Sequence, residues 1–406
     1  MHVTRIAIVG GGPGGYEAAL VAAQLGAEVS VIERDGAGGS AVLTGTVPSK
    51  TLIATADVMS LAAESAELGV RLGGKDAPGI EALHPDSKQV AADLARVNAR
   101  VKRLAQAQSA DITARLTRDG VRFLRGSGRL DGPQRVLATL ADGGEETIEA
   151  DAILVSTGAH PRVLPDAVPD GERILSWTDL YELDQLPERL IVIGSGVTGA
   201  EFASAYNVLG SEVVLVSSRE RVLPGEDADA AQVLEDVFAR RGMTVLSKSR
   251  AQSVKRVGDG VLVALEDGRT VEGSHALMAV GSVANTADLG LEQAGVRLDK
   301  GGFIEVDRVS RTSARGVYAA GDCTGVLIWP PSPRCRAGLR CGMPWATRSR
   351  PWTSRPSAPT CSPTRRSPRW ATRRSTSTGA ESPMPASNCR WPPTRGPRCR
   401  VSPTVS

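Results

Sequence analysis

Two sets of glycines with the same spacing are the residues best suited to chemistry in this sequence. The first set is a G-x-G-x-x-G pattern that comprises Gly10, Gly12, Pro13, Gly14 and Gly15. In such a pattern the first glycine allows a sharp turn, the second lets a pyrophosphate approach the backbone, and the third lets a helix pack closely on a strand. Glu33 follows 18 residues after the third glycine, where a carboxylate can accept hydrogen bonds from ribose hydroxyls. The pattern predicts dinucleotide binding, with a purely structural glycine-rich turn as the alternative.

The second set repeats the pattern 184 residues later and comprises Gly194, Gly196, Val197, Thr198 and Gly199. Two such units predict two nucleotide-binding domains. The segment that follows ends in Ser217 and Arg219 and has no carboxylate at the position equivalent to Glu33. Hydroxyl and guanidinium groups suit a ribose 2′-phosphate better than a 2′-hydroxyl, so we expect this site to take NADPH, or both NADH and NADPH.

Alternating strands and helices must position these glycines. Residues 6–9 form an apolar, β-branched run that predicts a buried strand, and the alanine-rich residues 16–25 predict a helix that ends before a strand at 28–32. The same order returns as a strand at 190–193, a helix to residue 209 and a strand at 212–216. The expected fold class is therefore α/β, with two Rossmann-like dinucleotide-binding domains of three-layer ββα architecture.

Less regular segments surround these two units. Helices are predicted at 51–68 and at 89–118, where an amphipathic stripe is expected to face the core. Short strands separated by glycine-rich turns at 121–124, 136–140 and 147–149 predict a small antiparallel meander. The remaining predicted strands lie at 152–155, 245–254, 260–266, 269–272, 276–280 and 317–320.

Composition limits the class of protein. The chain has 406 residues, is 41% hydrophobic, and has no apolar run near the roughly 20 residues that span a bilayer. We also find no signal peptide and expect a cytoplasmic protein. The first 326 residues carry 33 basic and 44 acidic residues, which argues against a nucleic-acid partner, and contain one cysteine, Cys323. The four histidines show no metal-ligand spacing, so no metal site is expected.

Several motifs together resemble a known family. The two glycine units, the Ser-Thr-Gly of residues 156–158 and the sequence GVYAAGD that ends at Asp322 resemble the two-dinucleotide flavoprotein disulfide reductases, the group of dihydrolipoamide dehydrogenase and glutathione reductase. The resemblance covers roughly residues 3–326. It implies FAD at the first glycine unit and NAD(P)H at the second, with an FAD-binding domain at 1–160 and 282–326 and an NAD(P)-binding domain at 161–281.

The resemblance also implies roles for single residues. Asp322 would hydrogen-bond the ribityl chain of FAD, and Gly128 and Gly158 would lie along the cofactor. Lys50 would sit beside the isoalloxazine ring and pair with Glu201, and these two are the implied catalytic residues. Thr157 and Gly281 complete the implied cofactor-binding set. The alternative for Lys50 and Glu201 is that they are unrelated surface charges on separate helices.

One departure from the family pattern decides the expected chemistry. The redox motif of the family, G-G-x-C-x-x-x-x-C-x-P-S-K, corresponds to residues 38–50, where Ala41 and Thr46 stand at the two cysteine positions. Without a dithiol, thiol–disulfide exchange is not available. The segment is more similar to the cysteine-poor branch that reduces quinones, so we expect hydride transfer from NAD(P)H to FAD and onward to a quinone-like acceptor. The alternatives are a dihydrolipoamide dehydrogenase-like flavoprotein and an inactive nucleotide-binding remnant.

Residues 327–406 differ from the rest of the chain. They contain 15 arginines, no lysine, one acidic residue and 15 of the 25 prolines, and show no apolar periodicity. We expect this segment to be disordered and to result from a shifted reading frame, with a genuine basic, disordered extension as the alternative. It stands where the family has an interface domain, so the homodimer expected of full-length relatives is doubtful for this chain.

Overall fold

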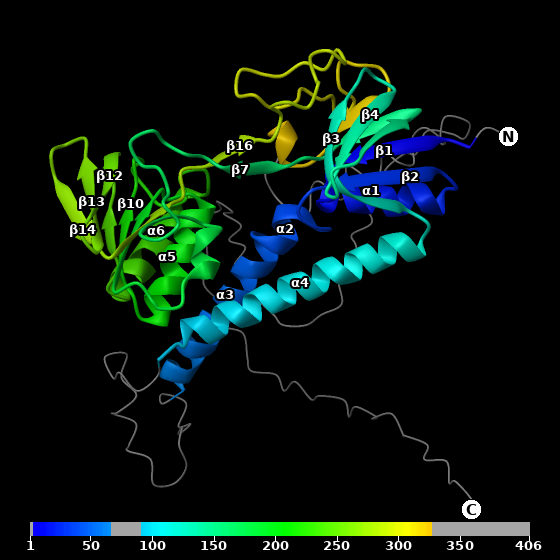
Figure 1. Cartoon of the computed structure of the whole chain (residues 1–406). Coiled ribbons are helices and arrows are strands. Elements are labelled where there is room, and N and C mark those ends of the chain that lie inside the picture. Colours follow the sequence, from blue (N-terminus) through cyan, green and yellow to red (C-terminus); the bar gives the residue numbers. More distant parts are fainter. Residues whose placement is uncertain (1–2, 66–90, 327–406) are drawn as a thin grey trace, which may run out of the picture. The chain divides into compact units, whose positions relative to one another are not determined.

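The computed structural model describes residues 3–65 and 91–326 (Figure 1). The C-terminal segment 327–406 and the start of the helix predicted at 89–118 lie outside the described residues. Two sheets, each with helices on one side and further strands on the other, organise the described part of the chain. The α/β class and the Rossmann-type parallel sheets predicted from the sequence are confirmed.

The first sheet has the strand order β17-β6-β1-β2-β3-β4-β5. Its strands are β1 (Arg5–Val9), β2 (Glu28–Glu33), β3 (Arg122–Leu130), β4 (Arg135–Leu140), β5 (Glu145–Glu149), β6 (Ala152–Val155) and β17 (Val317–Ala319). The strands from β17 to β3 are parallel, and β3, β4 and β5 form the predicted antiparallel meander. The carboxyl ends of β1, β6 and β17 therefore meet at one edge, where ligands bind in open α/β sheets.

Both faces of the first sheet are buried, which explains why its central strands are apolar without alternation. On one face, Ile6 and Ile8 of β1 pack with helix α1 (Pro13–Gln24) and with Leu116 of helix α4 (Leu94–Arg118). On the other face, Val9 packs with the meander and with the chain that returns after residue 285, including Val296. This is the three-layer arrangement expected from the sequence.

The second sheet is entirely parallel and has the order β11-β10-β9-β15-β8. Its strands are β8 (Ile174–Ser176), β9 (Arg189–Ile193), β10 (Glu212–Val216), β11 (Thr244–Leu246) and β15 (His275–Met278). Helices α5 (Val197–Leu209) and α6 (Ala228–Arg240) accompany it. The antiparallel strands β12 (Ala251–Val257), β13 (Gly260–Leu265) and β14 (Thr270–Gly273) cover the other face through a shared valine-rich core.

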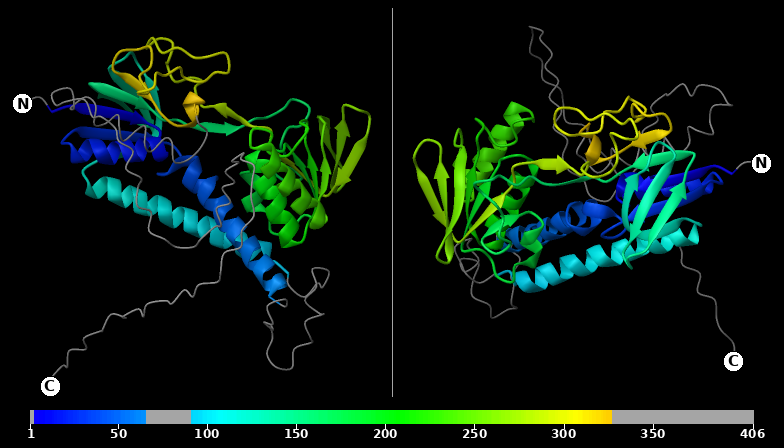
Figure 2. Two further views of the ribbon diagram at one scale, coloured as in Figure 1. Left: turned by 180° about the vertical axis from the view of Figure 1, so that it is seen from behind. Right: turned by 45° about the horizontal axis from the view of Figure 1, so that its top comes forward.

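The chain passes between the two sheets twice. It leaves the first through β7 (Ala159–Pro161) and returns through β16 (Ser282–Ala284), and these strands pair in an antiparallel ribbon (Figure 2). The short helix η2 (Asp179–Glu182) lies in the second part, and η3 (Asp322–Thr324) follows β17 in the first. The first sheet is therefore completed by a strand from the end of the described chain.

Two long helices connect the cores of the two sheets. Helix α2 (Gly39–Leu43) is followed by α3 (Thr46–Glu64), whose Leu52 and Ala56 pack into the core of the second sheet. Helix α4 contributes Leu94 and Val101 to that same core and Leu116 to the core of the first sheet. Figure 1 shows α4 crossing α3 and reaching the strands of the first sheet. The composition of these helices did not predict this connecting role.

Several element boundaries differ from the sequence-based expectations. The helix predicted at 51–68 begins at Thr46 and ends at Glu64. The helix predicted from residue 89 begins at Leu94, because the Asp93 side chain accepts a hydrogen bond from Arg96 N at 3.0 Å and caps it. The strand predicted at 245–254 is two strands, interrupted where Lys248 has a φ of 53°. Helix α6 and the three-residue strands β7, β8 and β16 were not predicted.

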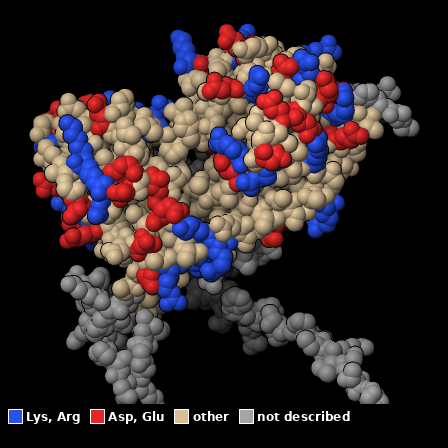
Figure 3. Space-filling model, viewed as in Figure 1, with Lys and Arg blue, Asp and Glu red and all other residues tan. Residues whose placement is uncertain are grey.

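The described surface is of mixed charge. On the face shown in Figure 3, acidic and basic side chains are interspersed over both sheets. Within residues 3–65 and 91–326, no helix is both long and apolar enough to cross a lipid bilayer.

Candidate cofactor and redox site

The first glycine turn is shaped by close contacts within the protein. Gly10 follows β1 with a φ of 102°, and a Cβ there would collide with the carbonyl oxygen of Ser156. A Cβ at Gly15 would collide with the carbonyl oxygen of Gly10. These two glycines are required by the left-handed backbone and by the packing of α1 on β1.

Gly12 has no such reason to be glycine. Its φ is −67°, which any residue can adopt, and a Cβ there would meet no protein atom within 4 Å. Gly12 is also the N-cap of α1, and no side chain caps this helix, which begins at Pro13. Open space above an uncapped helix N-terminus fits a phosphate group that approaches the backbone closely. The pyrophosphate of a dinucleotide is such a group, so the turn fits the cofactor expected there.

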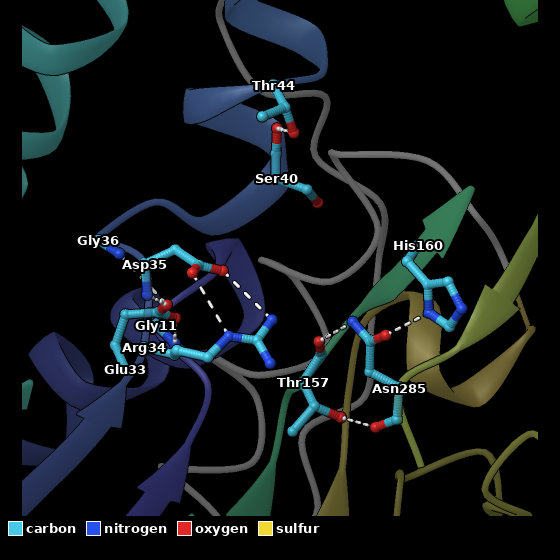
Figure 4. A network of polar contacts seen from close by, with 10 residues as sticks. All are labelled: Gly11, Glu33, Arg34, Asp35, Gly36, Ser40, Thr44, Thr157, His160 and Asn285. Atoms are coloured by element: carbon cyan, nitrogen blue, oxygen red, sulfur yellow. Dashed lines mark hydrogen bonds and ion pairs between the residues drawn. The ribbon is translucent and has the colours of Figure 1, made fainter. Parts of the chain in front are cut away.

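Glu33 lies beside this turn at the end of β2. Its Oε2 accepts a hydrogen bond from Gly11 N at 2.6 Å, and its Oε1 accepts one from Asp35 N at 2.7 Å (Figure 4). The side chain is 8% exposed. Backbone amides therefore fix the position of the carboxylate, and its remaining acceptor capacity is available to a ligand hydroxyl.

Asp322 stands at the same edge of the sheet, after β17. Its carboxylate has no hydrogen bond with any of the described residues, and burial raises its pKa. A half-buried acceptor without a donor fits a ligand hydroxyl, such as one from the ribityl chain of FAD. The neighbouring Cys323 is completely buried, and burial raises the pKa of its thiol to about 11.

Thr157 and Gly158 follow β6 and belong to a polar network (Figure 4). The Thr157 hydroxyl donates to Asn285 O at 2.6 Å, and Asn285 Nδ2 donates back to Thr157 O at 2.9 Å. His160 Nδ1 donates to Asn285 Oδ1 at 2.6 Å. Gly158 has a φ of 71° and open space where a Cβ would lie. These hydrogen bonds fix the Thr157 side chain. They also join the segment after β6 to the segment after β16.

The second glycine turn repeats the first in detail. Gly194 has a φ of 109°, and a Cβ there would collide with Ala279 O, while a Cβ at Gly199 would collide with Gly194 O. Gly196 has a φ of −69° and no protein atom within 4 Å of a would-be Cβ. It caps α5, which begins with Val197 and Thr198 and has no side-chain cap. This turn therefore fits a second pyrophosphate.

The loop after β10 carries the residues that are predicted to bind a ribose 2′-phosphate. Ser217 is fully buried, and its Oγ lies 2.7 Å from Ser195 Oγ, so it holds the loop in place. Lys248 pairs with Glu220 at 2.9 Å and lowers the pKa of that carboxyl. Arg219 has no ion pair with any described residue and lines a pocket of about 450 Å³. Arg221 lines the same pocket and likewise has no ion pair with a described residue, so two guanidinium groups can meet an anion there. Gly281, after β15, has a φ of 95° and space where a Cβ would lie.

Lys50 and Glu201 are brought together although 151 residues separate them. Lys50 lies in the first turns of α3, Glu201 lies in the first turns of α5, and the two side chains form an ion pair. The side chains are 51% and 31% exposed. The pair joins a helix that follows the first cofactor turn to the helix that begins at the second.

The segment with the altered redox motif packs on the first cofactor turn. Gly38 N donates to Gly11 O at 2.8 Å, and a Cβ at Gly39 would lie 2.9 Å from Gly12 Cα. Ala41 follows this contact in α2, and Thr46 begins α3. Both are residues without a thiol.

Gly128 lies against the ends of β1 and β2, next to the residues that precede Gly10 and Glu33. It is buried in β3, and a Cβ there would lie 3.3 Å from Val9 Cγ1 and 3.4 Å from Ile32 Cγ2. The structure thus gives Gly128 a packing role between β3 and the neighbouring strands. Ser195 and Asn285 were missed by sequence reasoning, because their hydrogen bonds join segments that are distant in the chain.

Comparison with known proteins identifies the family. The sequence profile of the pyridine nucleotide-disulphide oxidoreductases matches residues 4–346. The chain belongs to this family. Proteins of the family use FAD and NAD(P)H, in agreement with two glycine turns that each leave room for a pyrophosphate.

Three relatives illustrate where the chain stands within the family. A protein of Mycobacterium tuberculosis named NAD(P)H dehydrogenase (quinone) is 55% identical over 334 residues, which cover 80% of this chain and 65% of the relative. A dihydrolipoyl dehydrogenase of Zymomonas mobilis is 35% identical over 78% of this chain and 66% of its own length. The crystal structure of LpdA from Mycobacterium tuberculosis matches with a TM-score of 0.78 and 50% identity, over 85% of this chain and 73% of LpdA. This chain therefore spans about two thirds of the length of such relatives.

Proposed function

We propose that this protein oxidises NAD(P)H through bound FAD and passes the electrons to a quinone. The observation that carries the proposal is the pairing of two open glycine turns with a redox segment that has Ala41 and Thr46 in place of cysteines. The relative named NAD(P)H dehydrogenase (quinone), at 55% identity, supports a quinone as acceptor.

The reaction balances without a sulfur relay. NAD(P)H gives up a hydride, which carries two electrons, and the quinone takes up two electrons and two protons, one of which comes from solvent. FAD, when bound, supplies the two-electron relay between them. Cys323 cannot replace a dithiol, because its thiol is buried and its pKa is raised to about 11.

The residues of the chain bind and orient the two cofactors. The N-terminus of α1 would face the FAD pyrophosphate, while Glu33 and Asp322 would accept hydrogen bonds from ribose and ribityl hydroxyls. The N-terminus of α5 would face the pyrophosphate of NAD(P)H. Arg219 would meet a 2′-phosphate, which favours NADPH or use of both nucleotides.

Lys50 and Glu201 act at the junction of the two cofactors. Lys50 supplies positive charge where negative charge accumulates during electron transfer. Glu201 holds the Lys50 ammonium group in place through the ion pair. The pair also joins α3 to α5, which pack in one apolar core.

The absorbance spectrum of the 406-residue chain supplied with FAD tests the proposal. We expect a bound-flavin spectrum that bleaches when NADPH or NADH is added without oxygen and returns when a quinone is added. A flavin that remains oxidised after addition of both nucleotides would contradict the proposal.

A dihydrolipoamide dehydrogenase-like activity is the second candidate, favoured by the relative from Zymomonas mobilis. Turnover of dihydrolipoamide with NAD⁺ distinguishes it from the first candidate. We expect no such turnover, because positions 41 and 46 carry no thiol. A chain that binds nucleotides but reduces neither acceptor would be a nucleotide-binding remnant.

A further inference from the structure

A pocket of about 790 Å³ lies between helices α3, α5 and α6. Each helix lines it with residues three or four positions apart, which lie on one helix face. Helix α3 contributes Lys50, Ile53, Ala56, Asp57 and Ser60. Helix α5 contributes Val197, Ala200, Glu201, Ser204, Ala205 and Val208. Helix α6 contributes Ala230, Ala231, Leu234 and Phe238.

Small side chains create the space. Ala56, Ala200, Ala205 and Ala231 are each at most 4% exposed, so they form the floor of the pocket together with the buried Phe238. Larger side chains at these positions would fill it. The volume is within the range of roughly 300–1,000 Å³ that is typical of small-molecule sites, and the lining is mainly apolar, as in such sites.

The pocket begins at the proposed redox centre. The ion pair of Lys50 and Glu201 forms part of its wall. From Lys50, α3 lines the pocket as far as Ser60, which corresponds to about 15 Å along the helix at a rise of 1.5 Å per residue. A ligand could thus present one end to the ion pair and lie along the apolar helices with the rest.

The charges of the lining disfavour phosphate groups along the helices, so the pyrophosphate proposed for the turn at Gly196 would lie outside this part of the pocket. Four carboxylates, those of Asp57, Glu201, Glu226 and Asp227, line the pocket, against the two cations of Lys50 and Arg241. Phosphate groups lying along this net negative lining would be repelled. A neutral, apolar molecule has no such penalty and gains from burial between the helices.

We propose that this pocket binds the hydrocarbon tail of a lipid-soluble quinone, whose ring lies at the Lys50–Glu201 pair. The inference rests on the proposed function and specifies its substrate class, a tailed quinone. The tail takes no part in electron transfer, and its contacts with α3, α5 and α6 lower the KM of the acceptor. Because the tail has no bond-breaking role, the reaction balance is the one given above.

Two alanines of α6 provide a matched test. Ala230 and Ala239 are both exposed positions on this helix, but only Ala230 lines the pocket. Phenylalanine at residue 230 would occupy the pocket, whereas at residue 239 it would point elsewhere. Ser204→Leu, on the opposite wall, is a second filling variant for the case in which Ala230→Phe fails to fold.

The assay compares two quinones that share one ring, one without a tail and one with a decyl tail. For the unmodified chain with FAD and NADPH, we expect the tailed quinone to have the lower KM. Ala230→Phe should raise the KM of the tailed quinone at least tenfold and leave that of the tailless quinone unchanged, and Ala239→Phe should change neither. Equal KM values for the two quinones, or equal effects of the two variants, would overturn the proposal.

Binding without turnover separates this inference from the proposed function. In equilibrium dialysis of the FAD-loaded chain without NADPH, the tailed quinone should bind, and Ala230→Phe should abolish the binding. If NADPH fails to reduce the flavin but this binding pattern is found, the proposed function fails and the pocket stands. If the flavin is reduced and both quinones turn over, but dialysis shows no binding of the tailed quinone that Ala230→Phe abolishes, the pocket proposal fails and the proposed function stands.

Discussion

Lys50 and Glu201 form an ion pair at the proposed junction of the FAD site and the NAD(P)H site. Their ion pair is substantially exposed, with side chains 51% and 31% accessible. Exposed pairs of this kind contribute only about 0–1 kcal/mol to stability. A charged pair that stabilises the fold so little, between a helix that follows the first cofactor turn and the helix that begins at the second, fits a role in electron transfer better than a role in folding.

Replacement of Lys50 by methionine tests that role. We expect Lys50→Met to leave the thermal unfolding midpoint nearly unchanged and to slow flavin reduction by NADPH at least tenfold, because the positive charge at the reacting centre is lost. Stopped-flow absorbance measures the rate. Lys102→Met is the matched control, since Lys102 forms a similarly exposed ion pair with Glu182 at 2.9 Å. An unchanged reduction rate would remove Lys50 from the mechanism.

His275 makes the stability of the chain depend on pH. Burial and the nearby Arg173 guanidinium lower the pKa of His275 from its ordinary value of 6.5 to about 4. Below pH 6.5 the imidazole becomes protonated in the unfolded chain but remains neutral in the folded one, so the unfolded state is favoured. The stability associated with the neutral histidine is therefore lost as the pH falls from 6.5 towards 4.

Thermal unfolding measured between pH 7 and 4.5 tests this effect in the unmodified chain and in His275→Gln. We expect the thermal unfolding midpoint to decrease more over this pH range in the unmodified chain than in the variant. Parallel curves for the two proteins would show that the imidazole does not contribute to the pH dependence.

The outcome for individual residues shows what a sequence can predict. Glycine spacing located both strand–turn–helix units, because the turn geometry is local to a few residues. The pairing of Lys50 with Glu201 followed only from family resemblance, since no local pattern relates residues 151 positions apart. The proximity of Ser217 and Gly128 to the cofactors stays a prediction, and their burial depends on tertiary contacts that the sequence does not state.

At the scale of elements, the two strand–turn–helix units are copies of one design. In each, the first and third glycines are required by contacts within the protein, while the second has open space beside an uncapped helix. The second glycine is therefore the position at which an alanine would disturb a ligand and not the fold.

Gly12→Ala and Gly196→Ala are controls for each other. Both backbones have φ values that alanine adopts, −67° and −69°, so we expect both variants to fold normally. Gly12→Ala should weaken FAD binding at least tenfold, or about 1.4 kcal/mol, and leave NADPH binding unchanged. Gly196→Ala should have the opposite pattern. Fluorescence titration of each cofactor measures both constants, and equal losses in the two variants would contradict the assignment of separate sites.

Element prediction succeeded where a periodic pattern or a glycine turn marks the element. Strand β6 was predicted with its observed bounds, because its short apolar run is followed directly by a turn. Strands β7, β8 and β16 have three residues each, too few to show any period, and their pairing partners are distant in the chain. The start of α4 is set by the Asp93 cap, whereas α3 begins after Gly45 without a side-chain cap, and helix ends of either kind are poorly indicated by composition.

At the scale of the whole described molecule, α4 links the two cores. Asn98, in the middle of this link, is 3% exposed and donates hydrogen bonds to Leu180 O at 3.0 Å and to Leu183 O at 2.8 Å. These bonds attach the helix to the segment that leads into the second sheet. We therefore expect the two sheets to unfold together.

Replacement of Asn98 by alanine would remove the side-chain donor of Leu183 O and leave Leu180 O with the long hydrogen bond from the Tyr206 hydroxyl at 3.4 Å. Because unsatisfied buried groups cost about 1–3 kcal/mol each, we expect Asn98→Ala to lower the unfolding midpoint by at least about 4 °C. Calorimetry should also show the single transition splitting into two. Gln108→Ala, at an exposed position on the same helix, should change neither the midpoint nor the number of transitions. A single, unshifted transition in Asn98→Ala would show that α4 does not couple the sheets.

The late position of β17 has a consequence for the order of events on the ribosome. This strand completes the first sheet and carries Asp322 to the cofactor edge, yet it is synthesised after the whole of the second sheet. The second sheet is made from one continuous stretch and can fold as soon as it emerges. The first sheet keeps an open edge until residue 319 has been translated, so the nascent polypeptide can complete its second sheet before its first.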